Sequence, residues 1–158
     1  MDLITGSSVL ITAEGRKRLV HIRGVFCSQW IAVFPDDIPN RIRAELASIR
    51  GWCATAWTQR KGAWKPFSQL KTRLENQTVT VAPRKMVGGH TIADIYLPSG
   101  KSLAHSLIKT GACEWNWYGE PDDTQLRDLE ILARKRRLGL FRYHFNEKRL
   151  LELGMYGR

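Results

Sequence analysis

The sequence predicts one α+β domain, in which strands form a sheet and helices gather beside it. Its 158 residues match a common single-domain size, and 43% hydrophobic with 25% charged residues is typical of a globular chain. Segments of β-forming residues alternate along the chain with segments whose apolar residues recur every three or four positions. These two periods indicate strands and helices within the same fold.

The N-terminal part begins with a predicted β-hairpin. Residues 9–13 and 19–26 are rich in β-formers and flank a polar turn at 14–18. A third apolar run at 30–34 leads into an amphipathic helix predicted over 39–50, because apolar residues recur there at helical spacing. The first fifty residues therefore supply two or three strands and one helix.

The later part alternates between helices and strands. A helix is predicted from Pro66 to Leu74, and strands follow at 78–81 and 91–97. The next helix is capped by Ser102 and ends at Gly111, and an extended segment follows at 114–118. The last helix begins at Thr124, and the residues expected to face inward are Leu126, Leu129, Leu132 and Ala133. The basic run Arg134–Arg137 suits the negative end of that last helix, where we expect its side chains to be solvated. This order also fits a five-stranded barrel of the oligonucleotide-binding (OB) type with helices packed on it.

Charge indicates the kind of partner. Lys and Arg total 25 against 15 Asp and Glu, which gives a net charge of +10 and an isoelectric point near 10.0. Residues 1–110 hold 16 basic and 7 acidic residues, so most of the excess lies there. Such a balance favours a polyanionic partner, with a merely soluble basic surface as the alternative.

Several protein classes are excluded or disfavoured. No run approaches the roughly 18 apolar residues that a membrane span needs, and the first residues lack the pattern of a signal peptide. The cysteines Cys27, Cys53 and Cys113 are odd in number and form no CxxC pair, which argues against a disulfide framework or a zinc site. We therefore expect an intracellular protein with free thiols in a reducing compartment.

Five segments in order carry a family resemblance: Gly89–Leu97, Ser99–Leu103, Leu107–Gly111, Pro121–Asp123 and Ala133–Phe141. Together they resemble the strand, turn, helix and "small residue, basic run, Leu-Gly-Leu-aromatic" ending of the staphylococcal nuclease-like (thermonuclease) family. A weaker likeness covers residues 5–29. The resemblance implies a five-stranded OB-fold-like barrel with three packed helices. It places one domain at 1–141, an insertion at about 30–64 and a C-terminal tail at 142–158.

The residues at the family's catalytic positions have changed. The resemblance implies calcium-dependent cleavage of DNA and RNA, which needs carboxylates for the metal, a general base and two phosphate-binding arginines. Ser7 and Phe26 stand at the metal aspartates, Gln29 at the general-base glutamate, and His21 and His90 at the two arginines. These side chains cannot supply that chemistry, so we expect no catalytic residues, no calcium and no other cofactor.

Two alternatives would restore chemistry. A shifted register would place Asp36 and Asp37 on the catalytic turn, but it breaks the spacing to the first metal position. His21 and His90, with Cys27 and Ser7 nearby, would otherwise form an acid/base pair or a His/His/Cys metal site, with Asp94 as an orienting carboxylate. We favour ordinary polar replacements in an inactive cleft, and a place for Asp94 at the rim of the sheet.

Nucleic-acid binding without cleavage, to RNA or single-stranded DNA, is the predicted function, because such barrels stack bases on aromatic rings while cations follow the backbone. Core packing is the alternative for the aromatic residues, and a solvated turn is the alternative for residues 16–18. The second hypothesis is a structural or scaffold subunit of a larger, RNA-containing complex, docking through the Trp-rich insertion 30–64, and the third is a metal-dependent nuclease with a rebuilt site. The candidate binding residues are Arg16, Lys17, Arg18, His21, Arg23, Arg84, Lys85, His90, Trp115, Trp117 and Tyr118.

Overall fold

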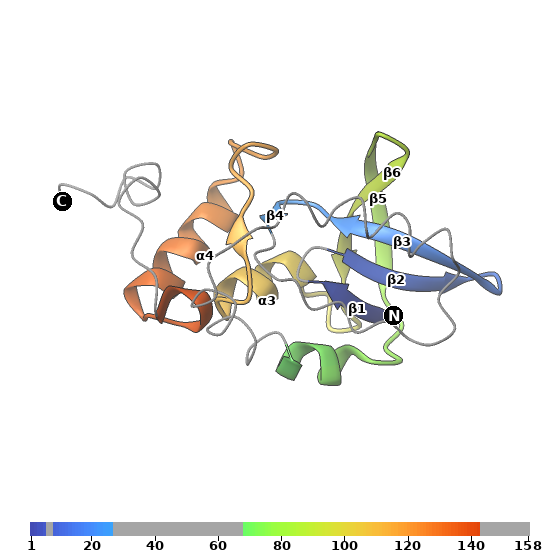
Figure 1. The fold of residues 1–158 in the computed structure, drawn as a ribbon, viewed down its shortest axis with the longest axis horizontal. Coiled ribbons are helices and arrows are strands. Elements are labelled where there is room, and N and C mark those ends of the chain that lie inside the picture. The colour runs from blue at the N-terminus through green and yellow to red at the C-terminus, as the bar shows by residue number, and fades with distance from the viewer. Residues whose placement is uncertain (6–7, 27–67, 143–158) are drawn as a thin grey trace.

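The protein is an α+β domain in which a mixed sheet packs beside helices, as the computed structural model of residues 1–5, 8–26 and 68–142 describes it (Figure 1). One sheet holds five strands in the order β1-β2-β3-β6-β5, and a second holds β4 and β7. The strands are β1 (Asp2–Thr5), β2 (Ser8–Ala13), β3 (Arg16–Ile22), β4 (Val25–Phe26), β5 (Thr80–Val87), β6 (His90–Tyr96) and β7 (Glu114–Trp115). The helices are residues 68–74, α3 (Leu103–Lys109), α4 (Thr124–Lys135) and the 3-10 helix η2 (Gly139–Arg142).

The predicted N-terminal hairpin is present, with a tighter turn than expected. Glu14 and Gly15 both have positive φ values, 51° and 73°, and Ala13 pairs with Arg16 across the turn. A two-residue turn with two positive φ angles matches the twist of the flanking strands. The basic residues 16–18 therefore belong to β3, and the prediction that they form the turn is wrong.

The sheet is not the closed barrel that was expected. β6 pairs in parallel with β3 and antiparallel with β5, which leaves β1 and β5 at the two edges. Pro83 removes a hydrogen-bond donor from the middle of β5, and the register shifts beside it. The Met1 amino group, just before β1, donates a hydrogen bond to the Gln77 carbonyl, which lies three residues before β5 (3.1 Å). In the described residues, β1 and β5 themselves are not paired as strands.

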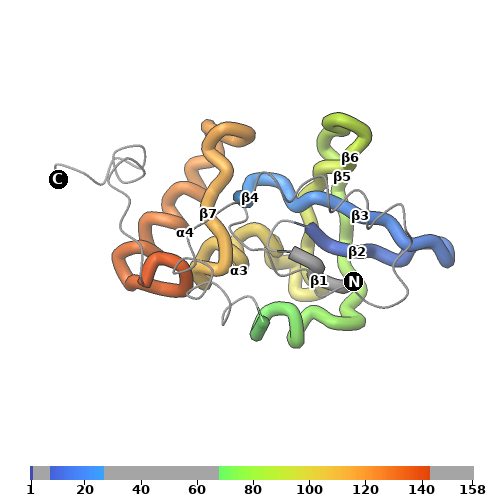
Figure 2. The backbone as a smooth tube through the Cα atoms, in the orientation of Figure 1, coloured from blue at the N-terminus to red at the C-terminus, as the bar shows by residue number. Residues whose placement is uncertain are grey.

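The helices cover one end of the sheet and share its core (Figures 1 and 2). α3 begins where Ser102 accepts a bond from the His105 amide, and α4 begins where Asp123 accepts one from the Leu126 amide. Apolar residues from both helices join β2, β3 and β6, including Val9, Ile22, Ala93, Ile95, Leu103, Leu107, Ile108 and Leu126.

Two expectations for the last helix are wrong. Leu132, expected inward, is 49% exposed, although its spacing fits the apolar side of α4. Arg134, expected at a solvated helix end, is buried. The apolar side of α4 is thus narrower than the sequence pattern indicates, since a buried cation shares that side with Ala133.

Several predictions fall outside the described residues. They are the strand at 30–34, the helix at 39–50, the Trp-rich insertion, most of the C-terminal tail, and the positions of Ser7, Cys27, Gln29, Asp36, Asp37 and Cys53. Cys113 is described, and it is a buried free thiol. Among the described helices, none is long and apolar enough to cross a membrane.

Candidate functional site

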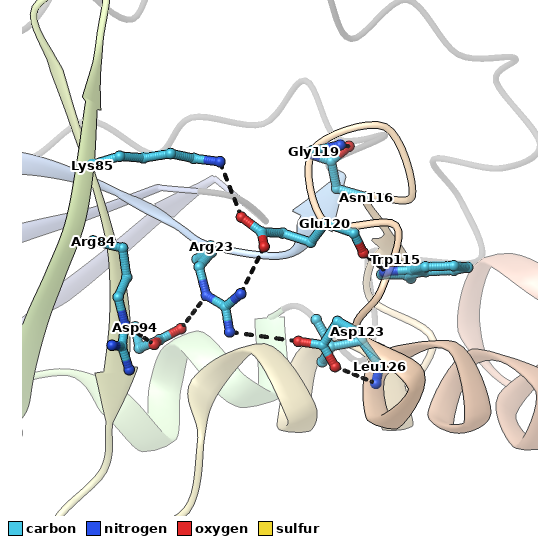
Figure 3. A network of polar contacts seen from close by, with 10 residues as sticks. All are labelled: Arg23, Arg84, Lys85, Asp94, Trp115, Asn116, Gly119, Glu120, Asp123 and Leu126. Atoms are coloured by element: carbon cyan, nitrogen blue, oxygen red, sulfur yellow. Dashed lines mark hydrogen bonds and ion pairs between the residues drawn. The ribbon is translucent and has the colours of Figure 1, made fainter.

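Arg23, directly after β3, forms the centre of a polar network (Figure 3). Its Nε donates to Asp94 Oδ1 at 2.8 Å and its Nη1 donates to Glu120 Oε2 at 2.8 Å. Its Nη2 lies 3.5 Å from Asp123 Oδ2. One guanidinium therefore contacts β6, the loop before α4 and the N-cap of α4.

The backbone brings these segments together. The Arg23 amide donates to the Ala93 carbonyl and the Asn116 amide donates to the Gly24 carbonyl, both at 2.9 Å. Gly24 has a φ of +81°, and a side chain there would collide with Leu126 in the first turn of α4. A glycine at this position thus lets the start of α4, with Asp123, lie beside Arg23.

Two further cations complete the network. Arg84 Nε donates to Asp94 Oδ2 at 2.6 Å, and Lys85 Nζ reaches Glu120 Oε1 at 3.1 Å. Both come from β5, so Lys85 joins the β5–β6 hairpin to the loop before α4 (Figure 3). We call these residues the Arg23 cluster: Arg23, Arg84, Lys85, Asp94, Glu120 and Asp123.

The charges in the cluster stabilise one another. Burial alone would raise the pKa of Asp94, but hydrogen bonds from Arg23 and Arg84, and the charges of both, lower it below the ordinary value. The hydrogen bond to Asp94 raises the pKa of Arg23, against the opposing effect of burial. Asp94 is therefore an ionised anchor shared by two guanidinium groups.

An open pocket of about 570 Å³ lies beside the cluster. We call residues 119–123 the acidic loop, because Glu120, Asp122 and Asp123 carry three carboxylates within five positions. The pocket is lined by Arg23, the acidic loop, Thr124 and Gln125. Its wall is thus more acidic than the net charge of the chain indicates.

The aromatic candidates have different environments. The rings of Trp117 and Tyr118 are stacked, with centroids 3.7 Å apart and planes at 28°, and Tyr118 is 77% exposed. Trp115 is 5% exposed and its Nε1 donates to the Glu120 carbonyl at 2.9 Å. Trp115 is therefore a core residue that holds the acidic loop, and the prediction that it contacts nucleic acid is not retained.

The two histidines that the resemblance places at the family's arginine positions lie in contact. His21 on β3 and His90 at the start of β6 make an edge-to-face contact with ring centroids 5.1 Å apart. His21 Nδ1 lies 2.9 Å from Ser8 Oγ, and Ser8 is buried. Phe26, which the resemblance places at a metal position, is 39% exposed, and its side chain has no ligand atom.

Carboxylates near these positions are already paired. Asp94 faces Arg23 and Arg84, and Glu120 faces Arg23 and Lys85. Within the described ranges, no group of three His, Cys, Asp or Glu residues could hold a metal ion. Of the residues that the resemblance places at the family's site, His21, Phe26 and His90 are described, and none of them supplies a carboxylate, the ligand that calcium prefers.

The other basic candidates lie elsewhere. Arg16 and Arg23 are seven positions apart along an extended segment, which spans about 23 Å. Arg16, Lys17 and Arg18 therefore lie at the start of β3, and Arg23 follows the other end of that strand.

A second arginine network is buried between α4 and β7. Arg134 Nη2 lies 2.8 Å from Glu130 Oε1 and 3.0 Å from Glu114 Oε1, and Glu130 is fully buried. The other carboxylate oxygen of Glu130 accepts from the Trp115 amide at 2.7 Å. The Arg134 guanidinium also lies 4.3 Å from the centre of the Phe141 ring. This network attaches β7 to α4.

Sequence reasoning missed two residues of the Arg23 cluster. Glu120 and Asp123 are separated from Arg23 by 97 and 100 residues, so no local period connects them. The available signal was the Pro-Asp-Asp-Thr segment, which predicted the start of a helix and indicated no partner for Arg23.

A comparison with protein families gives one match. The family model described as "Staphylococcal nuclease homologue" matches residues 59–143, more than half of the chain. The matched range holds β5, β6, α3 and α4, and with them every member of the Arg23 cluster except Arg23. No curated protein matches the chain.

Proposed function

The chain belongs to the staphylococcal nuclease homologue family, and we propose that it binds single-stranded nucleic acid beside the Arg23 cluster without cleaving it. RNA and single-stranded DNA both fit this proposal. The ligand would lie between the β5–β6 hairpin and the loop that carries Trp117 and Tyr118.

The observation that carries the proposal is the pairing of cations with an exposed aromatic ring. Arg84 and Lys85 are exposed on β5, and Lys85 reaches the loop two residues beyond Tyr118. Proteins that bind single strands use aromatic rings to stack bases and cations to follow the phosphates. Tyr118, stacked on Trp117, is such a ring.

The proposed loss of cleavage is supported by the residues at the old catalytic positions. Phe26 cannot ligate a cation, and His21 and His90 cannot grip a phosphate with two parallel bonds as arginine does. Ser8, beside His21, is 1% exposed, which makes it unsuitable as a nucleophile.

Fluorescence anisotropy tests the binding. Labelled single-stranded RNA and DNA are titrated with the protein in chelator, at several salt concentrations. We expect affinity that falls steeply with salt and weakens in Arg23→Ala and Trp117→Ala variants. Salt-sensitive binding that is equally strong in both variants would place the ligand on a general basic surface. Absence of binding at low salt would reject the proposal.

Incubation with labelled strands tests the absence of cleavage. Excess protein is held with RNA and DNA in calcium, magnesium or manganese, and we expect intact strands. Metal-dependent products that disappear in Phe26→Ala, Gln29→Ala or His90→Ala variants would show a working nuclease with a rebuilt site.

A scaffold subunit is the second candidate. Met86 and Val87, at the end of β5, are 66% and 52% exposed, which is unusual for adjacent large apolar residues. They would suit an apolar protein partner. Failure of the binding titration, together with capture of a defined partner that Met86→Ser abolishes, would favour this function.

A further inference from the structure

Carboxylates of the acidic loop form ion pairs with the cations that would bind the phosphates of a nucleic-acid strand. Glu120 uses both carboxylate oxygens, one on Arg23 at 2.8 Å and one on Lys85 at 3.1 Å. Two oxygens bridging two cations is the arrangement that the unesterified oxygens of a phosphate diester would also adopt. Asp123 approaches the remaining nitrogen of Arg23 at 3.5 Å.

The positive and negative charges within the Arg23 cluster are equal in number. The cluster has three cations, and Asp94, Glu120 and Asp123 pair with them through the contacts described above. Asp122, exposed on the same loop, adds another negative charge to the pocket wall. A phosphate therefore meets no excess positive charge in the cluster until a carboxylate leaves.

The two sides of the cluster differ in how readily they can exchange. The Asp94 side chain is 11% exposed and is held by two arginines. Glu120 and Asp123 are 19% and 18% exposed. Their contacts with Lys85 (3.1 Å) and with Arg23 Nη2 (3.5 Å) are longer than the contacts of Asp94 with Arg23 (2.8 Å) and Arg84 (2.6 Å), and such open, longer ion pairs are weak and exchange partners readily. Exchange is therefore expected on the side of the acidic loop.

The loop backbone can keep its place while its side chains move. The Glu120 carbonyl accepts from the buried Trp115 ring, and the Asn116 amide donates to Gly24. Rotation of the Glu120 side chain breaks neither bond. Withdrawal of the Glu120 carboxylate from Arg23 and Lys85 thus requires no unfolding.

From this geometry we propose that the acidic loop is an internal competitor for phosphate, which lowers the affinity of the Arg23 cluster for nucleic acid until a strand displaces Glu120 and Asp123. The inference rests on the proposed function and adds its regulation. A strand that both stacks on Tyr118 and presents phosphates to Arg23 and Lys85 displaces the loop more effectively than free phosphate does.

Amide variants test the competition without disturbing the fold. Glu120→Gln keeps the shape of the side chain and removes its charge. Asp123→Asn does the same and keeps a residue that caps helices as well as aspartate does. Asp128→Asn is the control, since it removes one exposed negative charge from α4, outside the acidic loop, and its carboxylate pairs with Arg127 and contacts no member of the Arg23 cluster in the described part of the chain.

The measurement is anisotropy with a fluorescent single-stranded RNA and a single-stranded DNA of equal length, across a salt series in chelator. We expect the Glu120→Gln/Asp123→Asn double variant to bind about 3- to 10-fold more tightly at low salt. Its salt slope should steepen by about 0.7 for each phosphate newly contacted. The Asp128→Asn control should change affinity less than about twofold, because water and salt screen exposed charges.

Two results would overturn the inference and leave the proposed function standing. Wild-type binding that needs Arg23 and Tyr118, combined with no tightening in the double variant, would show that the loop does not compete. Equal tightening in the Asp128→Asn control would show a general charge effect. Absence of binding by the wild type and every variant at low salt would reject the proposed function and the competition together.

Discussion

Two arginines organise this domain, and they differ chiefly in their access to water. Arg134 has a side chain that is 5% exposed and pairs with Glu130, which is fully buried. Arg23 has a side chain that is 27% exposed and lines an open pocket, and Lys85 and Arg84 belong to the same network (Figure 3). The partners are carboxylates in both networks.

The difference shows why similar ion pairs serve different purposes. In the buried network, loss of one partner leaves a charge that water cannot reach, so the contacts hold β7 against α4. In the Arg23 cluster, water or a phosphate can replace a departing carboxylate. The buried network is therefore expected to control stability, and the open one to control binding.

Breaking the buried network should have the largest effect. Glu130→Gln leaves Arg134 with Glu114 alone and weakens the bond from the Trp115 amide. We expect a loss of about 3–5 kcal/mol in the free energy of unfolding, measured by urea denaturation. A matched Asp128→Asn change, on the exposed side of α4, should cost little. A loss below about 1 kcal/mol for Glu130→Gln would contradict the assignment of this network to stability.

Removing the exposed ring should affect binding and leave the fold unchanged. Tyr118→Ala is expected to weaken single-strand binding by about 1–3 kcal/mol, since one base loses its stacking partner. Tyr118→Phe keeps the ring and should bind almost as the wild type does. Stability should hardly change in either variant, because Tyr118 is 77% exposed. Equal losses in both variants would show that the hydroxyl, and not stacking, matters.

The anchor of the Arg23 cluster should show a pH dependence. The pKa of Asp94 is lowered in the folded protein, so its ionised form stabilises the fold at pH values above the ordinary Asp pKa of about 3.9. That contribution is lost as the pH falls through the lower pKa of the folded state. Asp94→Asn should cost about 1 kcal/mol at pH 7, and the difference from wild type should shrink below pH of about 4. A difference that persists at acid pH would assign the effect to packing.

Local signals predicted much of the C-terminal fold. The strand at His90–Tyr96, the Ser102 cap of α3 and the start of α4 all follow from residues within a few positions of one another. The family resemblance is confirmed by the match over residues 59–143. The exposure of Leu132 was not predicted, because helical spacing gives the apolar side of a helix and not the width of the surface that covers it.

The candidate site was predicted only in part. Arg23, Arg84 and Lys85 were named as cations from charge and position, and Asp94 was placed at the rim of the sheet. Their pairing with Glu120 and Asp123 depends on the parallel contact of β3 with β6 and on the packing of Leu126 against Gly24. Those contacts join distant parts of the chain, so a single sequence offers no period that reveals them.

Amide chemical-shift mapping with a short single-stranded oligonucleotide tests the central claim most directly. Binding beside the Arg23 cluster predicts shifts concentrated at residues 84–90 and 116–123, together with changes at Arg23. It predicts small shifts at the basic end of α4, residues 135–137. Shifts confined to that helix end or to residues 16–18, with the Arg23 cluster unchanged, would contradict the account.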